Sequence, residues 1–447
     1  MRKPVATAIA LALALLTAIP ANAHADVRTS DLILGTSAVE RGIDASELPD
    51  ISAPHAIVLG PDGQAFYERD ATSPIKIASV TKVMTALVAL EHCDLTDIIT
   101  VDHAAATVGE SCVGLLEGDT LTMEEALTGL MVMSGNDAAT AIATTAGAKI
   151  DPASSNPYQT FIDAMNDKAR GLGCTDTVFE NPHGLDFDAW QGGLHSTTRD
   201  IATVYAAAME NEQFRAIDTT DRTSIEVRSA NGELRTIHLV VRNEIRGKGG
   251  NIGGKTGTTP EAGNCFIGTF EQENGGEVTI AVFGCEDNDK RWADSLALSS
   301  WYFGHIATAP AANSPRTRAS VPVIARIPCA DWTDKAVDAT LEDPAMELAA
   351  FSLGGEIELE TSLEPVHGGI AKGDRVGSVS YLQDGAQLGK ADLVAAQNVA
   401  APNPLEWAMV QFDRFVRFLE GKPSTAESHV YNETPDLLEL DTWNKAA

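Results

Sequence analysis

The spacing of apolar residues in the first 300 positions changes from strand-like to helix-like and back again. Short apolar runs at Ala56–Leu59 and Gln64–Tyr67 flank a Pro-Asp-Gly turn and predict a hairpin. Residues Val80–Leu90 are apolar almost all round, which predicts a helix that is buried on every side. Strands are predicted again at Phe266–Phe270 and Val278–Phe283. Strands at both ends with helices between them predict an α/β sandwich built on an antiparallel sheet.

The pattern changes again after this region. Residues 309–318 have the composition of a linker, so we expect the first domain to cover residues 26–308. Residues 319–397 contain alternating runs and an Asp-Gly hairpin signal, which predict a small all-β domain. Residues 404–420 are amphipathic at the helical period and predict a helix. Residues 421–447 are polar and acidic, and we expect them to form a flexible tail.

Residues 1–25 have the layout of a secretory signal. Arg2 and Lys3 precede an apolar stretch, Val5–Ile19, that is shorter than the roughly 20 residues a membrane-spanning helix needs. Small residues around Asn22 and His24 offer two cleavage sites. An uncleaved N-terminal anchor is the alternative. We therefore expect an exported protein that works in the cell envelope.

Charge and cysteine content narrow the function classes. Lys and Arg number 32 against 63 Asp and Glu, and the net charge of −31 disfavours nucleic-acid binding. Six cysteines are too few for a disulfide scaffold, although an exported chain could form disulfides. We expect Cys265 and Cys285 on neighbouring strands, and Cys93 with Cys112 is the other candidate pair. The ten histidines show no closely spaced ligand set, so neither a metal nor a cofactor is predicted.

Two Ser-x-x-Lys tetrads occur close together, Ser73 to Lys76 and Ser79 to Lys82. Ser73 is followed by proline, so Lys76 is expected to be a solvated loop charge. Ser79 stands at the mouth of the buried helix, and one helical turn brings Lys82 beside it. Burial and the positive helix terminus both lower the pKa of such an amine, which then suits a general base for a serine nucleophile. Taken alone, the tetrad favours a serine cap with a lysine that reaches solvent.

Two further segments have motif character. Ser134-Gly135-Asn136 joins two predicted helices, either as a plain turn or as a hydroxyl and an amide presented to a substrate. Lys255-Thr256-Gly257-Thr258 completes a formal phosphate-binding pattern, Gly-x-x-x-x-Gly-Lys-Thr. The preceding residues are polar, and the following Gly and Pro residues prevent a helix, so we reject that function. The segment is predicted to be an edge strand that carries a lysine and hydroxyls toward a cleft, where Gly257 lets a ligand approach the backbone.

The order Ser-x-x-Lys, Ser-x-Asn, Lys-Thr-Gly is the set used by penicillin-binding proteins and serine β-lactamases. The flanking residues sharpen the resemblance, at Ala78–Ala86, Met133–Ala139, Asn181–Asp186 and Gly254–Gly257. Over roughly residues 50–305 the chain resembles the low-molecular-mass D-alanyl-D-alanine carboxypeptidases, serine peptidase family S11. The resemblance continues more loosely at Lys372–Gly377 and in the C-terminal amphipathic helix.

The resemblance implies a β-lactamase/transpeptidase fold, with an antiparallel sheet flanked by helices and a helical subdomain. It implies a serine carboxypeptidase that removes the terminal D-alanine of peptidoglycan stem pentapeptides and is acylated by β-lactams. Ser79 would be the nucleophile, Lys82 the general base and Ser134 the proton relay. The backbone N–H groups of Ser79 and Thr258 would hold the oxyanion.

The resemblance also assigns residues to substrate binding. Asn136 would hold the substrate amide, while Lys255, Thr256 and Thr258 would bind the terminal carboxylate, with Arg291 as a helper. His183 and His195 are expected to be structural.

Two other functions remain as alternatives. A serine β-lactamase shares the three motifs, but the Glu-x-x-Leu-Asn segment of its class A members is absent between Asn136 and Lys255. A non-catalytic module that senses muropeptides or β-lactams is the other. For the helix at 404–420 the alternatives are membrane docking and packing on the β domain, and its mixed rather than basic polar face argues against electrostatic attachment to anionic lipid.

Overall fold

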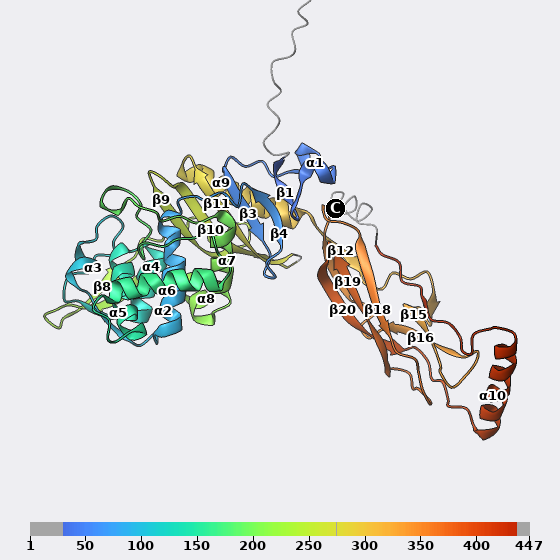
Figure 1. The fold of residues 1–447 in the computed structure, drawn as a ribbon. Helices are drawn as coiled ribbons and strands as arrows, with labels where there is room; N and C mark the ends of the chain where they lie inside the picture. Colours follow the sequence, from blue (N-terminus) through green and yellow to red (C-terminus); the bar gives the residue numbers. More distant parts are fainter. Residues whose placement is uncertain (1–29, 274, 436–447) are drawn as a thin grey trace, which may run out of the picture.

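The structure is a computed structural model that describes residues 30–273 and 275–435, so the predicted signal segment at 1–25 lies outside the described residues. An α/β domain and an elongated β domain follow one another along the molecule (Figure 1). A single helix, α10, lies at the end of the β domain that is farthest from the α/β domain. Both the α/β sandwich and the following β domain are as predicted.

The α/β domain is built on an antiparallel sheet, whose order in the described residues is β2-β1-β4-β3-β11-β10-β9. The strands are β1 (Leu32–Ile33), β2 (Thr36–Ser37), β3 (His55–Leu59), β4 (Ala65–Arg69), β9 (Asn251–Thr259), β10 (Gly263–Gln272) and β11 (Gly276–Cys285). Side chains alternate between the two faces, so that Ile57 packs into one core and its neighbour Val58 into the other. Because both faces are covered, the central strand β3 is apolar and buried at four consecutive residues, Ala56–Leu59.

Helices cover both faces of this sheet (Figure 1). The helices of the α/β domain are α1 (Ala38–Arg41), α2 (Lys82–His92), α3 (His103–Thr107), α4 (Met123–Val132), α5 (Asn136–Ile150), α6 (Pro157–Gly171), α7 (Thr198–Met209), α8 (Glu212–Asp218) and α9 (Asn288–Gly304). Short 3-10 helices lie at Ala45–Glu47, Ala78–Thr81 and Asp188–Trp190. Every residue of α2 from Lys82 to Leu90 is buried, as the apolar run predicts.

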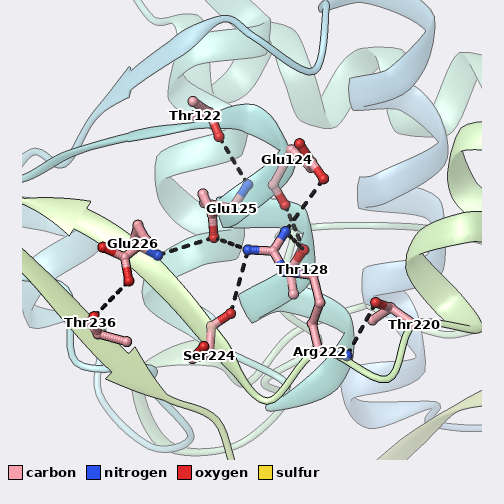
Figure 2. A network of polar contacts seen from close by, with 9 residues as sticks. All are labelled: Thr122, Glu124, Glu125, Thr128, Thr220, Arg222, Ser224, Glu226 and Thr236. Atoms are coloured by element: carbon pink, nitrogen blue, oxygen red, sulfur yellow. Dashed lines mark hydrogen bonds and ion pairs between the residues drawn. The ribbon is translucent and has the colours of Figure 1, made fainter.

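A smaller sheet borders the helical part, in the order β5-β6-β7-β8. Its strands are β5 (Ile98–Thr100), β6 (Thr120–Thr122), β7 (Ser224–Arg228) and β8 (Leu234–His238). Figure 2 shows how Arg222 fastens the β7–β8 hairpin to α4: its guanidinium lies 2.5 Å from Glu125 Oε2 and 3.4 Å from Glu124 Oε1. Glu125 also accepts a hydrogen bond of 3.2 Å from Glu226 N. The network joins the hairpin to the helix that leads into residue 134.

The β domain contains a sheet in the order β18-β19-β20-β16-β15-β21 and two short strand pairs. The strands are β12 (Ile306–Pro310), β13 (Thr317–Arg318), β14 (Val321–Pro322), β15 (Ala325–Pro328), β16 (Ala336–Leu341), β17 (Glu347–Phe351), β18 (Ile357–Leu363), β19 (Arg375–Gln383), β20 (Ala386–Ala395) and β21 (His429–Val430). Asp384 and Gly385 both have positive φ angles at the β19–β20 turn, which fits the predicted hairpin.

The prediction of a linker at 309–318 is wrong for much of its length. Strand β12 runs to Pro310 and pairs with β17, and Ala311 is buried. Phe351 of β17 packs on Phe66 and Trp301 of the α/β domain, with ring centroids 5.3 and 5.5 Å apart. An aromatic cluster therefore joins the two domains.

The predicted flexible tail is also wrong in part. His429–Val430 forms strand β21, which pairs with β15. Asn432 is buried, donates to Ala311 O at 2.9 Å and accepts from Asn313 N at 2.8 Å. Its amide satisfies backbone groups of the β domain, which a polar composition does not reveal. Residues 436–447 of the tail lie outside the described residues.

Helix α10 (Pro404–Leu419) packs with its polar side inward. Val410 is buried, Arg414 donates to Ala330 O, and Asp413 is hydrogen-bonded to Thr333. The opposite, apolar side is between 59% and 73% exposed at Leu405, Met409, Phe412, Phe415 and Leu419. The alternative in which the apolar face packs on the β domain is therefore wrong for these five residues, because they are exposed. In the described part of the chain, no helix combines the length and the apolar character needed to cross a membrane.

All six cysteines are free thiols. Cys265 and Cys285 do lie on the neighbouring strands β10 and β11, as predicted. They belong to different cores on the two faces of the sheet, so their side chains point apart.

Candidate active site

A cleft of about 460 Å³ lies where the outer strand β9 meets the helical part of the α/β domain. It is lined by Ser79, Ser111, Ser134, Val240, Val241, Arg242, Glu244, Thr256, Gly257, Thr258, Asn288 and Arg291. Members of all three sequence motifs therefore meet in one cavity, although they are separated by more than 50 positions along the chain.

Ser79 lies in the 3-10 turn Ala78–Thr81, and Lys82 begins α2. Lys82 Nζ is 2.9 Å from Ser79 Oγ and donates to Asn136 Oδ1 and to His183 O, both at 2.8 Å. Lys82 is fully buried, and burial lowers the pKa of its amine to about 7. When the amine is neutral, the two carbonyl oxygens take its two N–H groups, so its lone pair points to Ser79. The arrangement can remove the serine proton.

Two residues at the site have unusual backbone angles. Ala78, just before Ser79, has φ of 47°, and Ser134 has φ of 67°. Non-glycine residues rarely adopt these angles, and they persist only where surrounding contacts enforce them. Gly184 supplies one such contact, because a Cβ at Gly184 would lie 1.9 Å from Ala78 O. The backbone before the nucleophile is held by a loop far from it in sequence.

Lys255 lies on β9, the outermost strand of the sheet, as predicted for an edge strand. Its Nζ donates to Ser134 Oγ at 2.8 Å and to Thr256 O at 2.6 Å. Burial lowers the pKa of Lys255 well below its ordinary value, and the nearby charges of Lys82 and Arg291 add to this effect. The second amine thus contacts the second serine rather than Ser79.

The remaining predicted residues line the cleft along β9 and α9. A Cβ at Gly257 would lie 2.8 Å from Ile77 O and 3.2 Å from Ser79 N, so the two backbones touch at this point. Thr258 is exposed to the cleft. Arg291, in the first turn of α9, donates through Nη1 to Gly257 O at 3.2 Å and to Thr258 Oγ1 at 3.3 Å. It is buried, and this burial lowers the pKa of its guanidinium.

The two histidines and the first tetrad lie outside the cleft. His183 is buried with its ring against Trp190, and its carbonyl rather than its ring touches Lys82. His195 pairs through its backbone with Val178. Lys76 is not the solvated charge we expect from sequence: its Nζ donates to Gly192 O at 3.0 Å and to Leu194 O at 2.7 Å. Through these two hydrogen bonds, Lys76 holds the loop that contains Gly192 and Leu194.

Sequence reasoning missed four polar residues of the cleft, namely Ser111, Arg242, Glu244 and Asn288. Ser111, Arg242 and Glu244 lie in loops and Asn288 begins α9. None of the four belongs to a motif, so only their position in space identifies them. Ser111 is held beside the Ser134–Asn136 turn, because its carbonyl accepts from Asn136 N at 2.7 Å. Across residues 30–273 and 275–435, no group of three or more His, Cys, Asp or Glu side chains could hold a metal ion.

Comparison with known proteins identifies relatives. A family model described as D-alanyl-D-alanine carboxypeptidase, peptidase family S11, matches residues 43–287. D-alanyl-D-alanine carboxypeptidase DacB2 of Mycobacterium tuberculosis is 33% identical over 261 residues, which cover 57% of this chain and 84% of that protein. D-alanyl-D-alanine carboxypeptidase DacA of Escherichia coli is 26% identical over 416 residues, 88% of this chain and 93% of that protein. The crystal structure of the Streptomyces K15 DD-transpeptidase is 28% identical and covers 57% of this chain and 97% of its own, with a TM-score of 0.52.

Proposed function

The chain belongs to the D-alanyl-D-alanine carboxypeptidases of peptidase family S11, and we propose that Ser79 is the nucleophile with which it cleaves peptidoglycan stem peptides. It is a serine-type hydrolase that removes the terminal D-alanine. One observation carries the assignment of residues: Lys82 Nζ is 2.9 Å from Ser79 Oγ, and Lys255 Nζ is 2.8 Å from Ser134 Oγ, at one cleft.

In the proposed acylation step, neutral Lys82 takes the proton of Ser79 as its Oγ attacks the carbonyl between the last two D-alanines. The bond from Oγ to the carbonyl carbon forms, and the C–N bond then breaks. Ser134 relays to the leaving amine of D-alanine the proton that Lys82 took from Ser79, so that Lys82 is neutral again and Ser134 keeps its hydroxyl. Lys255, bound to Ser134 Oγ, keeps that hydroxyl oriented toward the cleft. Asn136 holds the substrate amide.

The charge that develops on the carbonyl oxygen would be stabilised by the backbone N–H groups of Ser79 and Thr258. The contact between the backbones at Gly257 and Ser79 supports this pairing. Thr256, Thr258, Lys255 and Arg291 would bind the terminal carboxylate of the peptide. Water then hydrolyses the ester between Ser79 Oγ and the peptide, which releases the shortened peptide and regenerates the Ser79 hydroxyl.

The test replaces Ser79 with Ala in the full chain and measures covalent labelling by a fluorescent penicillin. A matched control is Ser73→Ala, because Ser73 heads the other tetrad and its Oγ binds Asp70 at the surface. We expect labelling to disappear in the first variant and to persist in the second. Release of D-alanine from a D-Ala-D-Ala tripeptide should follow the same pattern. Labelling of Ser79→Ala would show that another residue is the nucleophile.

The lifetime of the penicillin adduct separates this function from its alternatives. A carboxypeptidase releases bound penicillin slowly, whereas a β-lactamase would turn it over rapidly. A sensing module would bind penicillin and release no D-alanine from the tripeptide. We expect a long-lived adduct together with peptide cleavage.

We further propose that α10 attaches the protein to a membrane surface. The polar side of the helix is used for contact with the β domain, and the exposed side carries Phe412 and Phe415. A helix of this kind can lie at the interface with its apolar side among the lipids. Because the polar side is mixed in charge, we expect binding to depend little on ionic strength.

Vesicle flotation of the full chain tests this attachment. Replacing both Phe412 and Phe415 with Asp removes the free energy gained by burying two phenyl side chains among the lipids, about 3–6 kcal/mol. Membrane binding should therefore weaken by roughly 100-fold or more. Val39→Asp is the control, because Val39 is 64% exposed on α1 of the other domain. Flotation of the double variant equal to that of the unmodified chain would contradict the proposal.

We also propose export through the segment at residues 1–25, which agrees with a substrate in the cell wall. The mature chain should begin at His24 or Asp26, and intact mass of the protein recovered outside the cell measures this. A mass that includes the segment would instead support an uncleaved anchor.

A further inference from the structure

Asp137 follows the Ser134–Asn136 turn directly and has no place in the three motifs. It lies in the first turn of α5 and is 1% exposed. Its carboxylate accepts four backbone N–H groups. Oδ1 accepts from Val113 at 3.0 Å and from Ala138 at 2.9 Å, while Oδ2 accepts from Gly114 and Leu115, both at 2.9 Å.

These bonds fasten the segment 109–115 to the beginning of α5. The same segment contacts Asn136 twice, because Ser111 O accepts from Asn136 N at 2.7 Å and Gly109 O accepts from Asn136 Nδ2 at 3.0 Å. Asn136 in turn contacts Lys82 through Oδ1 at 2.8 Å. Ser111 lines the cleft. A continuous set of hydrogen bonds therefore runs from Asp137 through the 109–115 segment to the general base.

The carboxylate also acts on Lys82 through space. The titratable groups that face Lys82 are Cys112 from the 109–115 segment, Asp137 from α5, His183 from the loop after α6 and Lys255 from β9. Of these four, Asp137 is the one carboxylate. Burial lowers the pKa of Lys82, and the carboxylate of Asp137 acts in the opposite direction and raises it. Its removal should therefore leave the amine easier to deprotonate.

We propose that Asp137 is a positioning residue for acylation, which fixes the 109–115 wall of the cleft on Asn136 and sets the charge beside Lys82. It touches neither Ser79 nor the substrate site and acts through its neighbours. The proposal rests on the assignment of Ser79 and Lys82. Loss of labelling in Ser79→Ala tests that assignment separately, so failure of either can be recognised.

The experiment measures the acylation rate of the full chain by a fluorescent penicillin between pH 5 and pH 9.5. Asp137→Asn should lower the constant acylation rate reached at alkaline pH, the plateau, roughly tenfold, because the N–H groups of the 109–115 segment lose acceptors. The acid limb is the part of the profile in which the rate falls as the pH is lowered. In this variant it should move to lower pH, because without the carboxylate the pKa of Lys82 falls. Asp137→Glu retains the charge with altered geometry, so its plateau should fall while its acid limb stays where it is in the unmodified chain.

Asp119→Asn is the matched control. Asp119 is also 1% exposed and accepts a backbone N–H of the neighbouring residues, from Leu116 at 2.8 Å, but it does not act on Lys82. We expect its acid limb to stay in place. The proposal is overturned if Asp137→Asn keeps the acid limb of the unmodified chain, or if Asp119→Asn moves it equally. Should Asp137→Asn fail to fold, an acid limb in Asp137→Glu that moves to lower pH overturns it as well.

Discussion

Replacement of Lys82 with Arg tests whether a buried, neutral amine drives the first step. Burial brings the pKa of Lys82 from 10.5 to about 7. At pH 7 about half of such amines are neutral, whereas only about one in 3,000 would be neutral with an ordinary lysine. The difference corresponds to about 5 kcal/mol in favour of the neutral form. A guanidinium has a pKa above about 12 and stays protonated, so it supplies no base.

The assay is the single-turnover acylation rate with a fluorescent penicillin, measured from pH 5.5 to pH 9.5. In the unmodified chain the rate should level off above about pH 7 and fall about tenfold for each pH unit well below it. Lys82→Arg should acylate roughly 10²–10⁴-fold more slowly at pH 7, with no recovery at higher pH.

Lys76→Arg is the control for this change. Lys76 donates to two carbonyl oxygens, which a guanidinium can also do, so its acylation rate should remain that of the unmodified chain. Two results would refute the reasoning. One is a Lys82→Arg variant that keeps more than about a tenth of the rate at pH 7. The other is an acid limb in the unmodified chain centred above about pH 9, where a solvated lysine begins to lose its proton.

Two further substitutions test contacts that hold the site and the fold in place. Gly184→Ala places a Cβ 1.9 Å from Ala78 O at a φ of 85°, so we expect both slower acylation and a lower Tm. The control is Gly171→Ala, which should change Tm little because Gly171 lies at a helix end with nothing within 4 Å of its Cβ position. Asp31→Ala leaves the buried Arg69 without its ion pair and should cost about 3–5 kcal/mol in urea unfolding; a loss below about 1 kcal/mol would show that water replaces the carboxylate.

Much of the α/β domain follows from local pattern. The run at Val80–Leu90 predicts a helix buried on all sides because apolar residues occupy eight of its eleven positions and leave no continuous polar face. Ser79 and Lys82 are one turn apart, so their contact follows from helix geometry once the helix is assigned. The Asp384-Gly385 turn is predicted for the same reason, since both residues tolerate positive φ.

Local pattern fails where a residue finds its partner far along the chain. Ala309, Pro310 and Ala311 suggest a linker, but Ala309 and Pro310 pair with β17, and Ala309 and Ala311 are buried. Asn432 suggests a solvated tail, but its amide satisfies two backbone groups of the β domain. Composition describes the average environment of a residue type and contains no information about such a partner.

The amino-acid sequence by itself determines the order of the three motifs, the helix that carries Lys82 and the family to which the chain belongs. Its context separates the two Ser-x-x-Lys tetrads, because Ser73 is followed by proline and Ser79 begins a buried helix, but the tetrad pattern leaves open whether Lys82 reaches solvent. Only the tertiary structure decides this. It buries Lys82 against Asn136, 54 positions away, and His183, 101 positions away, while Lys76 remains partly exposed. The removal of water lowers the pKa of one amine to about 7, and desolvation is a property of the folded surroundings rather than of the residue.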